Sequence, residues 1–166
     1  MMRILKAAIA AALLATPVMA EDDEGLVTFK SLKPELAINL ATAAMEHCRE
    51  QGYQVGVSVV DRSGQLQAFV RDRFAGAHTV ETATRKAWTA VSFRTNTSEL
   101  DEVTRPGNDA YGIRFISQAL PLGGGLMIES GGSMVGAVGV SGAPGPELDD
   151  ECAEAGIAAI EDQLGF

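Results

Sequence analysis

Histidine and cysteine are scarce in this chain of 166 residues, which contains only two of each. Two histidines exclude a metal centre built from several imidazoles, so a metal or haem iron would depend on one or two nitrogen donors. The cysteines, Cys48 and Cys152, form no CxxC zinc or redox motif. They leave two alternatives open, a disulfide between two neighbouring helices or two buried free thiols.

Basic residues are outnumbered, with 13 lysines and arginines against 22 aspartates and glutamates. The formal net charge of −9 at pH 7 predicts a surface that repels nucleic acid and anionic lipid. Basic partners, metal cations and neutral, largely apolar ligands remain compatible with such a surface.

The apolar run near the amino terminus, residues 7–15, follows Arg3 and Lys6 and is too short to cross a bilayer as a stable helix. Small residues at Val18-Met19-Ala20 then occupy the positions that a signal peptidase reads. We therefore expect residues 1–20 to be a signal peptide of a periplasmic or secreted protein, with a membrane anchor as the alternative. Residues 21–30 are expected to form an acidic, mobile terminus.

Motifs for nucleotide binding and nucleophilic catalysis are also missing. The chain has no GxxxxGK[ST] phosphate loop, no GxGxxG ahead of a helix and no nucleophile elbow. Gly123-Gly124-Gly125 precedes a predicted strand, which is the wrong context for a phosphate loop. The residues alone therefore do not establish enzymatic activity, and they favour a binding protein over an enzyme.

A glycine-rich apolar stretch, residues 122–142, predicts a central β-hairpin. Apolar runs at 126–128 and 134–140 flank a Gly-containing connection, residues 130–133. Neither face of the second run is polar, so both faces need a cover. Gly136 and Gly139 inside this strand indicate the close approach of a helix or of a flat ligand.

Helices and strands alternate along the rest of the chain. Apolar spacing, proline and glycine predict helices over residues 31–51, 79–93, 98–103 and 147–164, and a first hairpin with strands at 55–61 and 66–71. This order is typical of one α/β domain over residues 31–166, with an antiparallel sheet between helices.

His78 is the strongest candidate for an iron ligand. It lies where a loop enters a helix, and the positive end of the helix dipole disfavours imidazolium and leaves a neutral nitrogen available. The alternative is that His78 or Thr79 merely caps this helix. His47, near the end of its helix, is expected to be a packing residue.

Lys86 lies near a stripe of small apolar residues on the same predicted helix. Its ammonium group could pair with a haem propionate or with a substrate carboxylate. A solvated lysine on the outer face of the helix is the alternative. Glutamate pairs at 99/102 and 151/154 could in principle hold iron through oxygen ligands.

Six segments, in order along nearly the whole domain, carry a resemblance to a known family. They are VVDRSG at 59–64, AGAHT at 75–79 leading to RKAWTA at 85–90, PLGGG at 121–125, VGAVGVSG at 135–142 and DDECAEAG at 149–156. Through these segments the chain resembles the GlcG/HbpS-like family, also called the haem-degrading domain family and found as the carboxyl-terminal domain of PduO-type proteins.

The resemblance implies a profilin-like fold with a five-stranded antiparallel sheet between helices, and assembly into homo-oligomers. Some members of the family bind haem, and exported members are implicated in haem or iron sensing and protection. We therefore predict an exported, oligomeric protein that binds haem or a related tetrapyrrole for capture or sensing. In this hypothesis His78 holds the iron, Phe74 and Met127 cover the ring, and Lys86 meets a propionate.

Two other functions remain open at this point. One is an enzyme that acts on haem or a small carboxylate, with His78, Lys86 and Asp61 near one pocket. The other is an oligomeric partner that docks on the extracytoplasmic domain of a sensor protein through its acidic surface.

Overall fold

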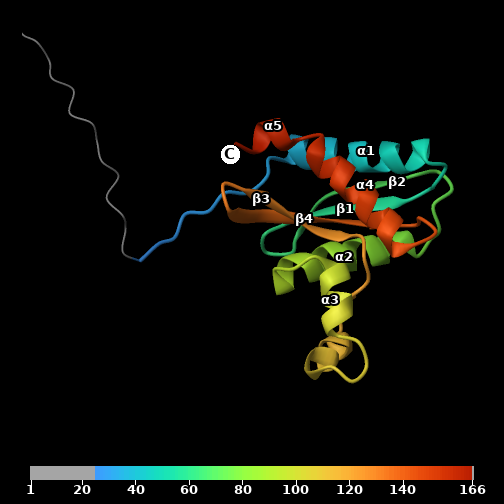
Figure 1. The fold of residues 1–166 in the computed structure, drawn as a ribbon. Helices are drawn as coiled ribbons and strands as arrows, with labels where there is room; N and C mark the ends of the chain where they lie inside the picture. Colours follow the sequence, from blue (N-terminus) through green and yellow to red (C-terminus); the bar gives the residue numbers. More distant parts are fainter. Residues whose placement is uncertain (1–24, 166) are drawn as a thin grey trace, which may run out of the picture.

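An antiparallel sheet lies between two layers of helices (Figure 1). The computed structural model describes residues 25–165. The sheet consists of β1 (Gly56–Asp61), β2 (Leu66–Arg71), β3 (Gly125–Ser130) and β4 (Ser133–Ser141), in the spatial order β2-β1-β4-β3. The predicted signal peptide and the first four residues of the predicted acidic terminus lie outside the described residues.

The expected five-stranded sheet is wrong, because the sheet within residues 25–165 has four strands. The long stretch between α2 (Thr79–Phe93) and β3 could have supplied a further strand. It folds instead into α3 (Thr97–Val103) and the 3₁₀ helix η1 (Asp109–Phe115). Both extend away from the sheet, below α2 in the view of Figure 1.

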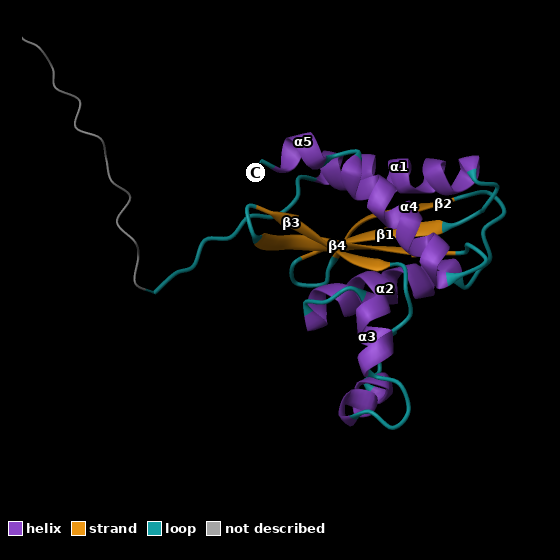
Figure 2. Cartoon of the chain, viewed as in Figure 1, coloured by secondary structure: helices purple, strands orange, loops and turns teal. Residues whose placement is uncertain are grey.

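Helices cover both faces of the sheet (Figure 2). α1 (Pro34–Glu50), α4 (Pro146–Ala158) and α5 (Glu161–Leu164) lie over the face that contributes Val57, Val59, Val138 and Val140 to the larger core cluster. α2 packs on the opposite face, where its alanines meet Val60 and Ala137. The predicted α/β domain with helices on both faces of an antiparallel sheet is confirmed.

The carboxyl-terminal helix ends earlier than predicted. The expected single helix over residues 147–164 is interrupted at Ala159 and Ile160, which separate α4 from α5. Ile160 is almost fully buried and Leu164 is 8 % exposed, and both belong to the larger core cluster. The turn therefore directs both side chains into the core.

The glycine-rich hairpin has one central strand and one edge strand, so the prediction of a wholly central hairpin is half wrong. Its turn is shorter than expected and consists of Gly131 and Gly132, with φ angles of +57° and +73°. At the outer edge of β3, the Gly125 amide donates to Thr97 Oγ1 at 2.8 Å and the Met127 amide to Asn96 Oδ1 at 3.1 Å. These bonds occupy part of the edge of β3.

Close packing of α2 explains Gly139. The sequence left two explanations open, the close approach of a helix and that of a flat ligand, and the structure has the first. A Cβ atom at this position would lie 2.0 Å from the Ala83 carbonyl oxygen and 2.7 Å from the Ala87 amide nitrogen of α2. Any side chain here would push α2 away from the sheet. This part of the ribbon therefore leaves no slot for a ligand.

Cys48 and Cys152 form a disulfide between α1 and α4, with 5.5 Å between their Cα atoms. Both residues are buried in the larger core cluster. The sequence left open a disulfide or two free thiols, and the structure contains the disulfide. It fixes the two long helices that cover one face of the sheet.

Candidate functional site

His78 and Lys86 line the same pocket, which has a volume of about 390 Å³. It lies where the first turns of α2 face the end of β4 and the start of α4. We call it the His78 pocket. Its other walls come from Leu122 and from residues 141–146, which lead from β4 into α4.

The His78 side chain is exposed at the start of α2. Its carbonyl oxygen accepts the Thr82 amide at 3.0 Å, but its ring forms no capping hydrogen bond. The ring packs over Gly76, where an added Cβ atom would lie 2.7 Å from Nδ1 and 3.8 Å from Nε2. Within residues 25–165 both ring nitrogens lack a hydrogen-bond partner, so the more distant Nε2 is available to a ligand.

Lys86 is buried, with 1 % of its surface exposed, so the alternative of a solvated lysine is wrong. Its ammonium nitrogen lies 2.6 Å from Asp149 Oδ2 and donates to the Val140 carbonyl oxygen at 2.9 Å. The charge that we expected to meet a ligand carboxylate is therefore already paired inside the protein. A propionate would have to displace Asp149 to reach it.

Asp149 is the acid of this pair and is only 4 % exposed. Burial raises the pKa of its carboxyl group, and the Lys86 ammonium group and the Ala143 amide oppose that rise without cancelling it. The Ala143 amide donates to Oδ1 at 3.0 Å. Asp149 thus ties the loop after β4 to the start of α4, beside the pocket.

The sequence analysis missed Asp149 because it is one of two acids in the first turn of α4, where either suits the helix dipole, and two more acids follow it directly. The sequence nevertheless contained an indication that Lys86 has an acidic partner. A lysine among small apolar residues is buried only with a counter-charge, and the acids of α4 were candidates for it.

The glycine-rich loop at 123–125 packs against the ion pair. Gly124 has a φ angle of +109°, and a Cβ atom there would lie 2.8 Å from Lys86 Nζ. Its amide donates to Asp150 Oδ1 at 2.5 Å, and the Ser98 hydroxyl donates to the same carboxylate. These glycines therefore serve backbone packing around Lys86 and Asp149.

Two hydroxyl groups that sequence reasoning also missed stand on the wall of the His78 pocket. Thr82 Oγ1 lies 2.6 Å from Ser141 Oγ and 2.9 Å from the His78 carbonyl oxygen. The two residues are 59 positions apart, so no local pattern could have paired them. Together they offer a hydroxyl donor and acceptors to a bound polar group.

Phe74 and Met127, the predicted ring-covering residues, do not line the His78 pocket. Phe74 is 79 % exposed on the loop before α2. Met127 lines another pocket of about 330 Å³, near the tip of the β3–β4 hairpin, together with Arg62 and Arg94. The structure thus brings together two of the four predicted contact residues.

Within residues 25–165, no group of three or more histidine, cysteine, aspartate or glutamate side chains gathers as a metal site. An iron ion brought in by a ligand would therefore rely on a single imidazole. In the same part of the chain, no helix is long and apolar enough to cross a membrane.

Comparison with known proteins shows that the chain matches the model of a known family. The model of the family described as "Haem degrading protein HbpS-like" matches residues 32–158. Among curated proteins, the corrinoid adenosyltransferase PduO of Salmonella typhimurium is 37 % identical over 123 residues, which are 73 % of this chain and 36 % of PduO. The chain thus spans about a third of the length of this relative.

Two solved structures are similar over most of their length. A double mutant of HbpS from Streptomyces reticuli is 37 % identical, with a TM-score of 0.77 over 87 % of this chain and 97 % of HbpS. The complex of PduOC with haem is 34 % identical, with a TM-score of 0.74 over 78 % of this chain and 95 % of PduOC.

Proposed function

Because this chain belongs to the HbpS-like family of haem-degrading proteins, we propose that it binds haem in the His78 pocket, with the His78 imidazole as the iron ligand. The observation that carries the proposal is the similarity to PduOC, whose structure is a complex with haem. His78 lines one of the three pockets described here and has a free ring nitrogen, whereas His47 lines none of the three.

The chemistry of the pocket fits such a ligand. Leu122, Ala143 and the prolines at 144 and 146 supply apolar surface, while Thr82 and Ser141 supply hydroxyls for a propionate. A volume of about 390 Å³ is at the low end of small-molecule sites, which span roughly 300–1,000 Å³. One copy of the chain would therefore cover only part of a macrocycle.

Haem supplies a redox-active iron when it is bound, and this chain supplies a nitrogen donor and partial exclusion of water. The buried Lys86–Asp149 pair holds the start of α4 against α2 and so keeps the pocket open between them. Its role in this proposal is to position the pocket wall.

Removal of the imidazole should weaken haem binding. In a hemin titration we expect the wild-type protein to shift the Soret band and to saturate at one haem per chain. His78→Ala should raise the dissociation constant at least about tenfold, since even loss of a residue that only orients a ligand costs 10- to 100-fold. His47→Ala, at the far end of α1, is the matched control and should bind as the wild type does.

Two outcomes would contradict this proposal. A wild-type protein that leaves the Soret band unshifted does not bind haem under these conditions. Equal spectra and affinities for wild type and His78→Ala would instead place the iron on another residue.

We further infer that the protein acts outside the cytoplasm as a homo-oligomer that captures haem or takes part in its sensing. Residues 1–20 have the pattern of a signal peptide, and the Cys48–Cys152 bridge suits an oxidising compartment. Phe115 is 73 % exposed and Val103 53 % exposed on the segment that extends from the sheet, which supports contacts between copies.

Mass spectrometry of the protein recovered from the periplasm or the medium tests this inference. Under denaturing conditions we expect the mass of a chain that begins at Glu21, and under native conditions a multiple of that mass. An uncleaved chain would contradict export by this signal, and a single-chain native mass would contradict the oligomer.

A further inference from the structure

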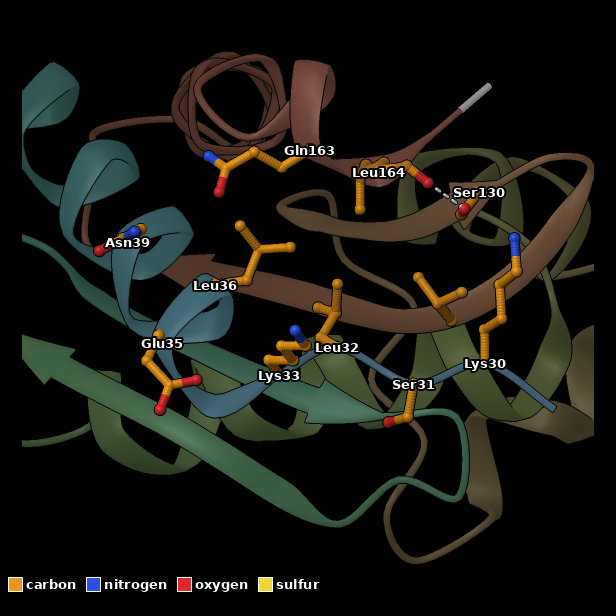
Figure 3. Close-up of a pocket in the computed structure, with 11 residues that line it drawn as sticks. Lys30, Ser31, Leu32, Lys33, Glu35, Leu36, Asn39, Ser130, Gln163 and Leu164 are labelled. Carbon is orange, nitrogen blue, oxygen red and sulfur yellow. Dashed lines mark hydrogen bonds between the residues drawn. The ribbon is translucent and has the colours of Figure 1, made fainter.

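A second cavity, of about 400 Å³, lies at the opposite end of β4 from the His78 pocket (Figure 3). It is bounded by the first turns of α1, by α5 and by the start of β4. We call it the α1–α5 pocket. None of its lining residues is a histidine or cysteine, so it offers no imidazole or thiolate ligand to haem iron.

The inner walls of the α1–α5 pocket are aliphatic. Leu32, Val135 and Leu164 are each less than 10 % exposed and belong to the larger core cluster, and Leu36 packs against that cluster. Figure 3 shows the Leu32 and Leu36 side chains directed into the space between α1 and α5, with Leu164 facing them from above. An apolar group placed here would lose contact with water on several sides.

Two lysines at the rim give this apolar space a positive charge. Lys30 and Lys33 both line the cavity, and within residues 25–165 neither ammonium group forms an ion pair or donates a hydrogen bond. Glu35 also lines the cavity, but in Figure 3 its carboxylate is directed away from the leucines.

The two lysines belong to a chain in which acids outnumber bases by 22 to 13. Of the eleven lysines and arginines in residues 25–165, six have a carboxylate within 4.0 Å, and Lys30 and Lys33 are among the five that have none. An acidic surface that leaves two ammonium groups unpaired beside an apolar cavity complements a molecule with an apolar body and an anionic head.

We propose that the α1–α5 pocket binds a small apolar carboxylate, of which a medium-chain fatty acid is the simplest example. Its tail lies between Leu36 and Leu164, over Val135, and its carboxylate meets the ammonium groups of Lys30 and Lys33. The Ser130 hydroxyl already donates to the Leu164 carbonyl oxygen and so holds α5 at the cavity wall. This site is independent of the haem proposal.

Calorimetric titration of the whole protein with octanoate, below the concentration at which octanoate forms micelles, tests the site. We expect saturable binding of one octanoate per chain, and no saturable binding of octylamine, which has the same tail and the opposite charge. Equal binding of the two compounds would overturn the proposal, as would the absence of saturable octanoate binding.

Surface variants then locate the binding. Lys30→Gln combined with Lys33→Gln should weaken octanoate binding about tenfold, the effect of losing a hydrogen bond to a charged group. Arg71→Gln removes an exposed cation that lies outside the pocket and should leave the affinity unchanged. An unchanged affinity in the lysine double variant would overturn the proposed site.

The proposals for the two ligand sites can be tested separately. His78→Ala should bind octanoate as the wild type does, and the lysine double variant should keep the wild-type Soret titration. Loss of octanoate binding in His78→Ala would place the carboxylate in the His78 pocket and overturn the present assignment.

Discussion

Replacement of Lys86 by methionine, with Asp149 left in place, should lower the free energy of unfolding at pH 7 by about 3–5 kcal/mol. The ammonium group of Lys86 is the only cation within 4.0 Å of the Asp149 carboxylate in the described residues. Without it, a carboxylate that is 4 % exposed has no counter-charge, and the cost of burying that charge is not offset. Chemical denaturation followed by circular dichroism measures the change.

The loss should be smaller in acid. Burial already raises the pKa of Asp149, and removal of the Lys86 charge should raise it further. A carboxyl group whose pKa is higher in the folded than in the unfolded protein stabilises the fold below its unfolded pKa, and this contribution disappears as pH rises through the folded value. Lys86→Met should therefore be closer to wild type near pH 4 than at pH 7.

Two further variants separate the ion pair from general effects of the substitution. Lys30→Met makes the same change at an exposed lysine and should alter stability by less than about 0.5 kcal/mol. Lys86→Met combined with Asp149→Leu removes both charges and should recover much of the loss, since apolar replacements of a whole buried pair are often neutral or stabilising. A loss below about 1 kcal/mol in Lys86→Met alone would mean that water reaches the pair.

The sequence predicted those elements whose signals are local. α2 begins and ends as expected, because Ala83, Ala87 and Ala90 repeat at helical spacing along its buried face. The β1–β2 turn also follows the prediction, with the Asp61 carboxylate accepting the amides of Ser63 and Gln65 at 2.7 and 3.0 Å. In both cases neighbouring residues decide the structure.

The errors at the candidate site concern contacts between distant parts of the chain. Lys86 and Asp149 are 63 positions apart, and no periodicity shows which of several acids in α4 faces the lysine. The position of β3 in the sheet is a second example. Its apolar residues predicted a central strand, but it lies at the edge of the sheet and pairs only with β4. The position of Met127 in another pocket follows from that arrangement.

The two pockets lie at opposite ends of β4, and both depend on where the carboxyl-terminal helices are held. Asp149 at the start of α4 lines the His78 pocket, while Leu164 in α5 lines the α1–α5 pocket. Between them, Cys152 joins α4 to α1. The bridge therefore anchors the segment on which both proposed ligand sites depend.

Removal of the Cys48–Cys152 bridge is expected to cause a loss of stability comparable to that of Lys86→Met. The cysteines are 104 residues apart, and the chain-entropy model gives about 4.7 kcal/mol for a loop of about 100 residues, with measured values mostly of about 2–5 kcal/mol. Cys48→Ala combined with Cys152→Ala should thus lower the free energy of unfolding by about 3–5 kcal/mol in chemical denaturation.

Reduction of the wild-type protein provides the matched control, because it opens the same loop without changing a residue. Wild type treated with a reductant should approach the stability of the double variant, whereas the double variant itself should not respond to the reductant. Both cysteines are buried in the core cluster, so alanine at these positions removes the bond and one buried sulfur atom from each side chain. If oxidised and reduced wild type unfold at the same denaturant concentration, the bridge does not constrain the unfolded chain as this reasoning requires.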